Sequence, residues 1–93
     1  MTAKIAVPGW VLNETLLKFP GVSPYVVGFG KYIGDLVTSL DHALDPYNDR
    51  YFIVIVRSTD DYFADYAEVV LVYVPEEYYI NDVIGHMYML LQK

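Results

Sequence analysis

Two short runs of aromatic and β-branched residues place the strongest limit on what this chain can fold into. Residues 51–56 read YFIVIV and residues 69–74 read VVLVYV, and neither run contains a charged residue. Residues of these types favour strands, and a strand that is apolar on both faces has to be covered on both faces. We therefore expect two central strands of a sheet, with other elements packed on each side.

The segment between the two runs predicts that these strands are antiparallel neighbours, because it is too short for a comfortable parallel crossover. Pro75 directly follows the second run and ends it. A further short strand is expected at residues 4–7, where Pro8 and Gly9 favour a turn. The expected sheet is therefore small and antiparallel, with two central strands and a short N-terminal third strand.

The longest helical periodicity covers residues 23–45, where apolar residues recur at steps of three and four. Ser23 followed by Pro24 is a favourable helix start, because Ser can cap the first amides and Pro loses nothing at the first position. Three glycines oppose a helix in the first half, since each costs about 1 kcal/mol relative to Ala. We predict one long amphipathic helix, with an alternative in which residues 25–29 are extended and the helix starts near Gly30.

Two further helices are expected, one before residues 23–45 and one after the second strand. Asn13 can cap a brief helix over residues 14–19, which Pro20 and Gly21 would end. A final helix from Glu76 or Glu77 to about Gln92 would begin with acids that complement its positive end. The sequence as a whole predicts a single α+β domain over residues 1–93, with the long helix and the C-terminal helix packed on the sheet.

The size of the domain favours association with a second chain. A chain of 93 residues buries only somewhat over 60% of the surface that it exposes when unfolded, so its core is marginal. The chain has no cysteine, which leaves neither a disulfide nor a thiolate metal site to add stability. Two doubly apolar strands and a C-terminal helix that is apolar on two sides exceed what one such chain can cover. We therefore predict a homodimer.

The interface of this dimer is predicted at the sheet or at the C-terminal helix. In a helical projection of the last segment, Tyr78, Gly85 and Met89 fall opposite the apolar stripe that faces the core. Tyr and Met around a Gly are unusual on a face turned to solvent and suggest a contact surface. His86 lies four residues after Asp82 and is a candidate pH-sensitive contact at the same interface, or simply a histidine at the edge of the core.

An acidic surface gives an alternative function. The chain has 12 acids against 6 bases and a net charge of −6, which repels nucleic-acid phosphates and makes direct binding to nucleic acid unlikely. The same acids could instead occupy the basic groove of a partner protein, as DNA-mimicking inhibitors do, or they could serve solubility. The residues of this acidic strip are Asp60, Asp61, Asp65, Glu68, Glu76 and Glu77.

Anion or nucleotide binding is a third hypothesis. Gly28, Gly30 and Lys31 precede the confident part of the long helix, and backbone amides at a glycine-rich helix start can hold a phosphate. The spacing matches neither the Walker loop, because Tyr32 follows Lys31, nor the dinucleotide fingerprint. Close helix packing or a strained turn is the structural interpretation of the same glycines.

No set of residues in the sequence predicts catalysis. The two histidines have no nucleophile beside them and lack the spacing of a zinc site, so we expect no enzymatic activity, no metal and no cofactor. No uncharged stretch approaches the roughly 20 apolar residues that span a bilayer, and no targeting segment is recognised. The sequence therefore favours a small acidic cytoplasmic protein that acts as a homodimer in protein–protein interaction or regulation.

Overall fold

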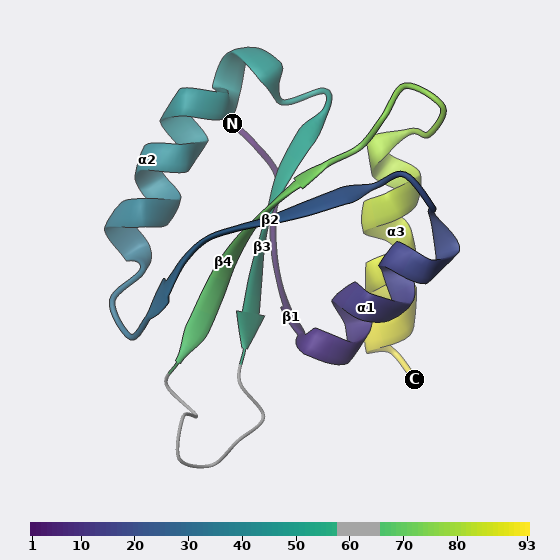
Figure 1. The fold of residues 1–93 in the computed structure, drawn as a ribbon, viewed down its shortest axis with the longest axis horizontal. Coiled ribbons are helices and arrows are strands. Elements are labelled where there is room, and N and C mark those ends of the chain that lie inside the picture. The colour runs from purple at the N-terminus through teal and green to yellow at the C-terminus, as the bar shows by residue number, and fades with distance from the viewer. Residues whose placement is uncertain (58–65) are drawn as a thin grey trace.

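The computed structural model describes residues 1–57 and 66–93. Within them a mixed four-stranded sheet has helices on both faces (Figure 1). The elements in chain order are β1 (Lys4–Pro8), α1 (Gly9–Lys18), β2 (Ser23–Gly30), α2 (Gly34–Leu44), a 3₁₀ turn (Asp45–Tyr47), β3 (Tyr51–Arg57), β4 (Ala67–Tyr73) and α3 (Ile80–Leu91).

The strand order in the sheet is β1-β3-β4-β2. The two apolar runs form the central strands β3 and β4, which are antiparallel neighbours as predicted. The predicted N-terminal strand is also confirmed, but it lies parallel to β3, so the expectation of a purely antiparallel sheet is wrong. The fourth strand, β2, pairs with β4 and was expected to be helix.

The helices α1 and α2 lie on opposite faces of the sheet (Figure 1). The chain crosses from β1 to β2 through α1 and returns from β2 to β3 through α2. Right-handed connections that run in opposite directions along a sheet place their helices on opposite faces. One face carries α1 and α3, and its core is built from the apolar residues Ile5, Val7, Val11, Leu12, Val22, Phe52, Val54, Val70, Val72, Val74, Val83, Met87 and Leu90.

The other face is covered less completely. Ile53 and Val69 are buried there, although α2 itself has no buried residue. The first residues of the chain hold α2 in place: the Met1 amine lies 2.6 Å from a carboxylate oxygen of Asp45. The backbone N–H of Thr2 donates to Asp41 at 2.6 Å, and Lys4 Nζ lies 3.3 Å from the second oxygen of that carboxylate. The same residues that open β1 thus fix the position of α2.

The prediction of one long helix over residues 23–45 is wrong in its first half. Residues 23–30 form strand β2, and α2 begins only at Gly34. The alternative with residues 25–29 extended is confirmed, although the helix starts four residues later than Gly30. Two adjacent β-branched residues and two glycines disfavour a helix here, and pairing with β4 gives the backbone its hydrogen bonds instead.

The other two helices are shifted from their predicted bounds. The helix expected at residues 14–19 begins at Gly9, because Pro8 ends β1 in an extended conformation and turns the chain directly into α1. The C-terminal helix begins at Ile80, since residues 75–78 form a turn in which the N–H of Tyr78 donates to the carbonyl of Pro75. Tyr78 therefore lies outside α3.

Candidate interaction surfaces

The backbone of β2 has one side bonded to β4 and one side turned outward. The N–H of Val74 donates to the carbonyl of Arg50 at 2.8 Å, so this pair and every second pair after it are hydrogen-bonded between β3 and β4. The β4 residues between them, Tyr73, Leu71 and Val69, therefore direct their backbone groups to β2. The residues opposite these on β2 point inward, and they are Ser23, Tyr25 and Gly28.

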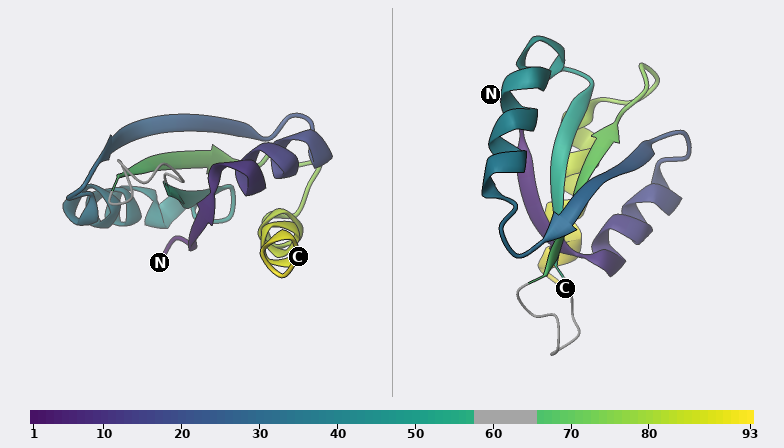
Figure 2. Two further views of the ribbon diagram at one scale, coloured as in Figure 1. Left: turned by 90° about the horizontal axis from the view of Figure 1, so that it is seen from below. Right: turned by 60° about the vertical axis from the view of Figure 1, so that its left-hand side comes forward.

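The alternate residues of β2, Pro24, Val26 and Phe29, direct their backbone groups away from the sheet. Pro24 fits this position because it has no N–H to donate. A register shift between Val26 and Gly28 inserts Val27 as a bulge and keeps Phe29 outward. Figure 2 shows β2 as the outermost strand, and no other element described by the structure lies over its outer edge.

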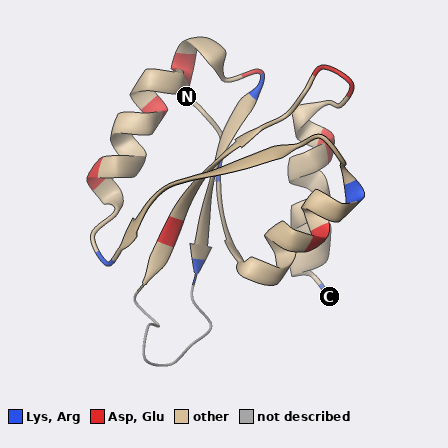
Figure 3. Ribbon diagram, in the orientation of Figure 1, with Lys and Arg blue, Asp and Glu red and all other residues tan. Residues whose placement is uncertain are grey.

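Large apolar side chains lie exposed along this edge. Tyr25 is 70% exposed, Val26 55% and Phe29 72%. The strand contains no charged residue, and the first charge met along the chain after it is Lys31 (Figure 3). A long, apolar and uncharged edge strand is a template for pairing with another strand. We call residues 23–30 with this outward side the β2 edge.

Three tyrosines, of which Tyr25 and Tyr73 are exposed and Tyr51 is half-buried, form a second surface on the face that α2 covers only in part. Tyr51 on β3 lies directly opposite Tyr73 on β4, and their ring centroids are 5.2 Å apart. Tyr25 on β2 opposes Leu71, which places it diagonally next to Tyr73 on the same face. Tyrosine is enriched in protein interfaces because it combines apolar area with a hydrogen-bonding tip. This tyrosine surface meets the β2 edge at Tyr25.

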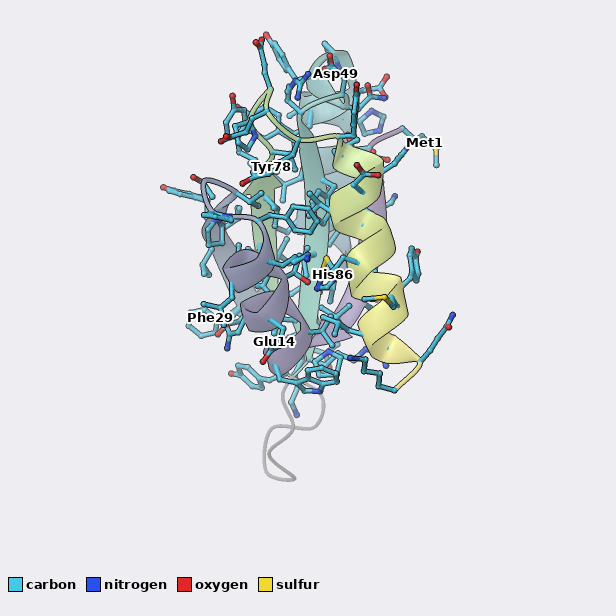
Figure 4. The ribbon with its side chains drawn as sticks, turned by 90° about the vertical axis from the view of Figure 1, so that its right-hand side faces the viewer. Met1, Glu14, Phe29, Asp49, Tyr78 and His86 are labelled. Carbon is cyan, nitrogen blue, oxygen red and sulfur yellow. The ribbon has the colours of Figure 1, made fainter. Side chains whose placement is uncertain are left out.

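The four residues predicted for a dimer interface divide into two pairs. Tyr78 and His86 face the space between α1 and α3 (Figure 4), where both rings make edge contacts with Phe19. The Tyr78 hydroxyl also donates to the carbonyl of Pro20 at 2.7 Å. Gly85 and Met89 are exposed on α3. The structure therefore joins Tyr78 and His86 to α1 of their own chain and leaves Gly85 and Met89 on an outer surface.

The acidic residues are not gathered into one strip by the residues that the structure describes. Glu68 is near the start of β4, whereas Glu76 and Glu77 follow its far end, and the strand between Glu68 and Tyr73 alone spans about 16 Å. Figure 3 shows the acids spread over several elements. Asp60, Asp61 and Asp65 lie outside the described residues, so the acidic partner surface stays a prediction.

The glycines of the anion-binding hypothesis lie in a strand and not at a helix start. Gly28 opposes Val69 and Gly30 opposes Ala67, both inside the β2–β4 pair. Gly28 fits the alternative interpretation of close helix packing, because a Cβ there would come within 2.8 Å of the Leu36 side chain on α2. Anion binding at Gly28, Gly30 and Lys31 stays a prediction, without the helix N-terminus on which it was based.

Two ionisable groups among the described residues have a pKa that departs from its ordinary value. Across residues 1–57 and 66–93, no three His, Asp or Glu side chains are grouped as a metal ion would require. The pKa of Asp41 is lowered by the hydrogen bond from the Thr2 amide and by Lys4. The pKa of the Met1 amine is raised by its hydrogen bond to Asp45. Both shifts belong to the contact between β1 and α2, which is structural.

No described helix is long and apolar enough to span a membrane. Comparison of the chain with protein-family models, with curated proteins and with solved structures gave no match.

The β2 edge was missed in the sequence, because residues 23–30 were expected in a helix or, in the alternative, extended but not part of the sheet. Its signal in the sequence is a strand-like run, YVVGF, between Pro24 and Gly30, with no charge over residues 19–30. Pro at the beginning of a strand is typical of sheet edges. An uncharged run that starts with Pro could thus have indicated an edge strand.

Proposed function

We propose that this chain is a small acidic protein–protein interaction or regulatory protein that acts as a homodimer and has no catalytic activity. The observation that carries the proposal is the β2 edge, where Tyr25, Val26 and Phe29 stay exposed. This strand has no buried residue, whereas β1, β3 and β4 each have buried residues. Exposed apolar groups gathered at one place on a small protein are typical of binding surfaces.

The tyrosine surface supports a binding role in the same region. Tyr25 belongs to both the β2 edge and the tyrosine surface, while Tyr51 and Tyr73 extend the aromatic area across two more strands. A dimer built at this side would bring aromatic groups of two chains close to one another. Such a surface suits a protein partner better than a nucleic acid, because the chain carries a net charge of −6.

Sedimentation equilibrium at micromolar concentration tests the proposal. We expect a mass twice that of the 10.7 kDa chain, falling toward the monomer on dilution. A monomer that persists at tens of micromolar would refute the homodimer. Met89 is 49% exposed on α3, and Met89→Glu shows whether that helix carries the contact.

A further inference from the structure

We propose that two copies of the chain join through their β2 edges, antiparallel and about a two-fold axis, so that two four-stranded sheets become one continuous sheet. This inference rests on the proposed homodimer and names its contact surface and register. A two-fold contact must pair the same patch with itself. An edge strand meets this demand easily, because an antiparallel strand pair is self-complementary.

The outward residues of β2 select one register. Pro24 and Phe29 both point outward and are five residues apart, so opposing Pro24 to the partner's Phe29 repeats symmetrically at the other end of the strand. Pro24 has no N–H, so each such pair would be joined by one hydrogen bond, from the Phe29 N–H to the Pro24 carbonyl. This register sets Val26 opposite the partner's Val27. The two-fold axis passes between this pair and the equivalent pair of Val27 with the partner's Val26. Placing Val26 opposite itself would instead set Pro24 against Gly28, whose backbone groups already point to β4.

The side chains agree with the same register. Pro24 opposes Val72 and Phe29 opposes Glu68, and these two β4 residues lie on the face that carries α1 and α3. Directly opposed residues of antiparallel strands share a face. Pro24 and the partner's Phe29 would therefore meet side chain to side chain, and this contact would cover the exposed Phe29 ring of each of the two chains.

Charges at the two ends of β2 also complement each other in this arrangement. Lys31 directly follows β2 and makes no ion pair with any residue that the structure describes. Near the other end, Glu77 Oε1 lies 3.0 Å from the place that a Cβ on Gly21 would take. In the proposed register Lys31 comes opposite the partner's Val22, next to the partner's Glu77. Two acidic chains would thus meet along an uncharged strand with an attractive pair at each end.

The first test compares the same substitution on the two edges of the sheet. Val26→Lys would set two lysines beside the two-fold axis and remove two valines that the proposed contact would bury, which we expect to weaken the dimer on the order of 100-fold or more. Ala6→Lys places the same charge on the exposed side of β1 and should leave the dimer mass unchanged. Circular dichroism of both variants shows whether the monomer is still folded.

The second test exchanges the charges at the strand ends. Lys31→Glu and Glu77→Lys should each raise the dimer dissociation constant by about 2- to 30-fold, since each change removes two exposed ion pairs. The double variant Lys31→Glu/Glu77→Lys should restore most of the loss. Additive losses in the double variant would overturn the register.

The homodimer and its contact at the β2 edge can be refuted independently. A dimer that survives Val26→Lys but dissociates with Met89→Glu would overturn the β2 contact and keep the homodimer. A wild-type chain that is monomeric would refute both. If Val26→Lys unfolds the chain, Phe29→Ser takes its place in the test. Phe29→Ser removes an exposed ring, and we again expect a folded monomer.

Discussion

The two edges of the sheet differ in how they are protected from pairing with another strand. The edge strand β1 has five residues, with Lys4 near its start and Pro8 at its end. The edge strand β2 has eight residues and no charge. Short length, lysine and proline are the features by which proteins prevent edge-to-edge pairing. The β1 edge has all three, whereas β2 has only Pro24.

This contrast indicates that β2 is left open for a contact. Edge protection is usually applied to both sides of a sheet, because one open edge is enough for aggregation. A strand as apolar as β2 would therefore be a liability in a chain that remained alone. The two edges should therefore respond differently to the same perturbation.

The largest expected effect is covalent capture of the dimer at the β2 edge. The chain has no cysteine, so Pro24→Cys/Phe29→Cys introduces the sole thiols, and they lie too far apart within one strand to pair with each other. In the proposed register each would face the other residue's thiol across the contact, at the spacing of opposed strand residues, which suits a disulfide. We expect most chains to run as a dimer on a non-reducing gel after mild oxidation.

A matched pair on the other edge is the control for this experiment. Lys4→Cys/Pro8→Cys places two thiols on β1 at a similar separation, and this variant should run as a monomer on the same non-reducing gel. Equal cross-linking at the two edges would contradict the comparison, because it would indicate random collision and not a defined contact.

The sequence predicted the two central strands directly, but it gave an extended conformation for residues 25–29 only as an alternative to a helix, for a physical reason. The runs at residues 51–56 and 69–74 are apolar on both faces, and that property fits no exposed element. Residues 23–30 have apolar groups at spacings that fit a helix as well as a strand. Their strand conformation depends on pairing with β4, where Ser23 meets Tyr73, and the local pattern alone does not decide a contact so distant in sequence.

The predicted grouping of Tyr78 with Gly85 and Met89 depended on where the last helix begins. A helix that started at residue 76 or 77 would place Tyr78, Gly85 and Met89 on one face, but α3 begins at Ile80. Tyr78 therefore lies in the preceding turn and reaches Phe19 and Pro20. The exposure of Gly85 and Met89 followed correctly from the periodicity, because both residues are inside the helix.

A medium effect is expected where β2 touches α2. A Cβ on Gly28 would come within 2.8 Å of Leu36 Cδ2, so Gly28→Ala forces the end of that side chain to move. We expect the free energy of unfolding to fall by about 1 kcal/mol, measured by urea denaturation at one fixed protein concentration. Because Gly28 directs its backbone groups to β4, the dimer mass should not change.

Gly85→Ala is the matched control for this substitution. A Cβ at Gly85 meets nothing within 4 Å, and Ala inside a helix is more favourable than Gly by about 0.5 to 1 kcal/mol. The two identical substitutions should therefore change stability in opposite directions. A dimer weakened by Gly85→Ala would instead indicate that α3 is the contact, since close packing over Gly85 leaves no room for a methyl group.

The smallest expected effect is the pH dependence of the β1 edge. The pKa of Asp41 is lowered from its ordinary value of 3.8, first by the hydrogen bond from the Thr2 N–H and then by Lys4. A group whose pKa is lower in the folded than in the unfolded state stabilises the folded state at pH values above the ordinary pKa. This contribution disappears as the pH falls through the lowered value. The pKa of the Met1 amine is raised from 8.0 by Asp45. The contribution of the protonated amine to stability is therefore complete below pH 8 and disappears as the pH rises through the raised value.

The contact between the N-terminus and α2 should thus be strongest between about pH 5 and 8. Thermal melting of the wild type and of Asp41→Asn should differ most in this range and converge under acid, while Asp49→Asn, in an exposed turn, should follow the wild type throughout. The contact joins β1 to α2 and does not include the outer side of β2. The dimer dissociation constant of Asp41→Asn should therefore equal that of the wild type, and a large change would mean that the two edges are not independent.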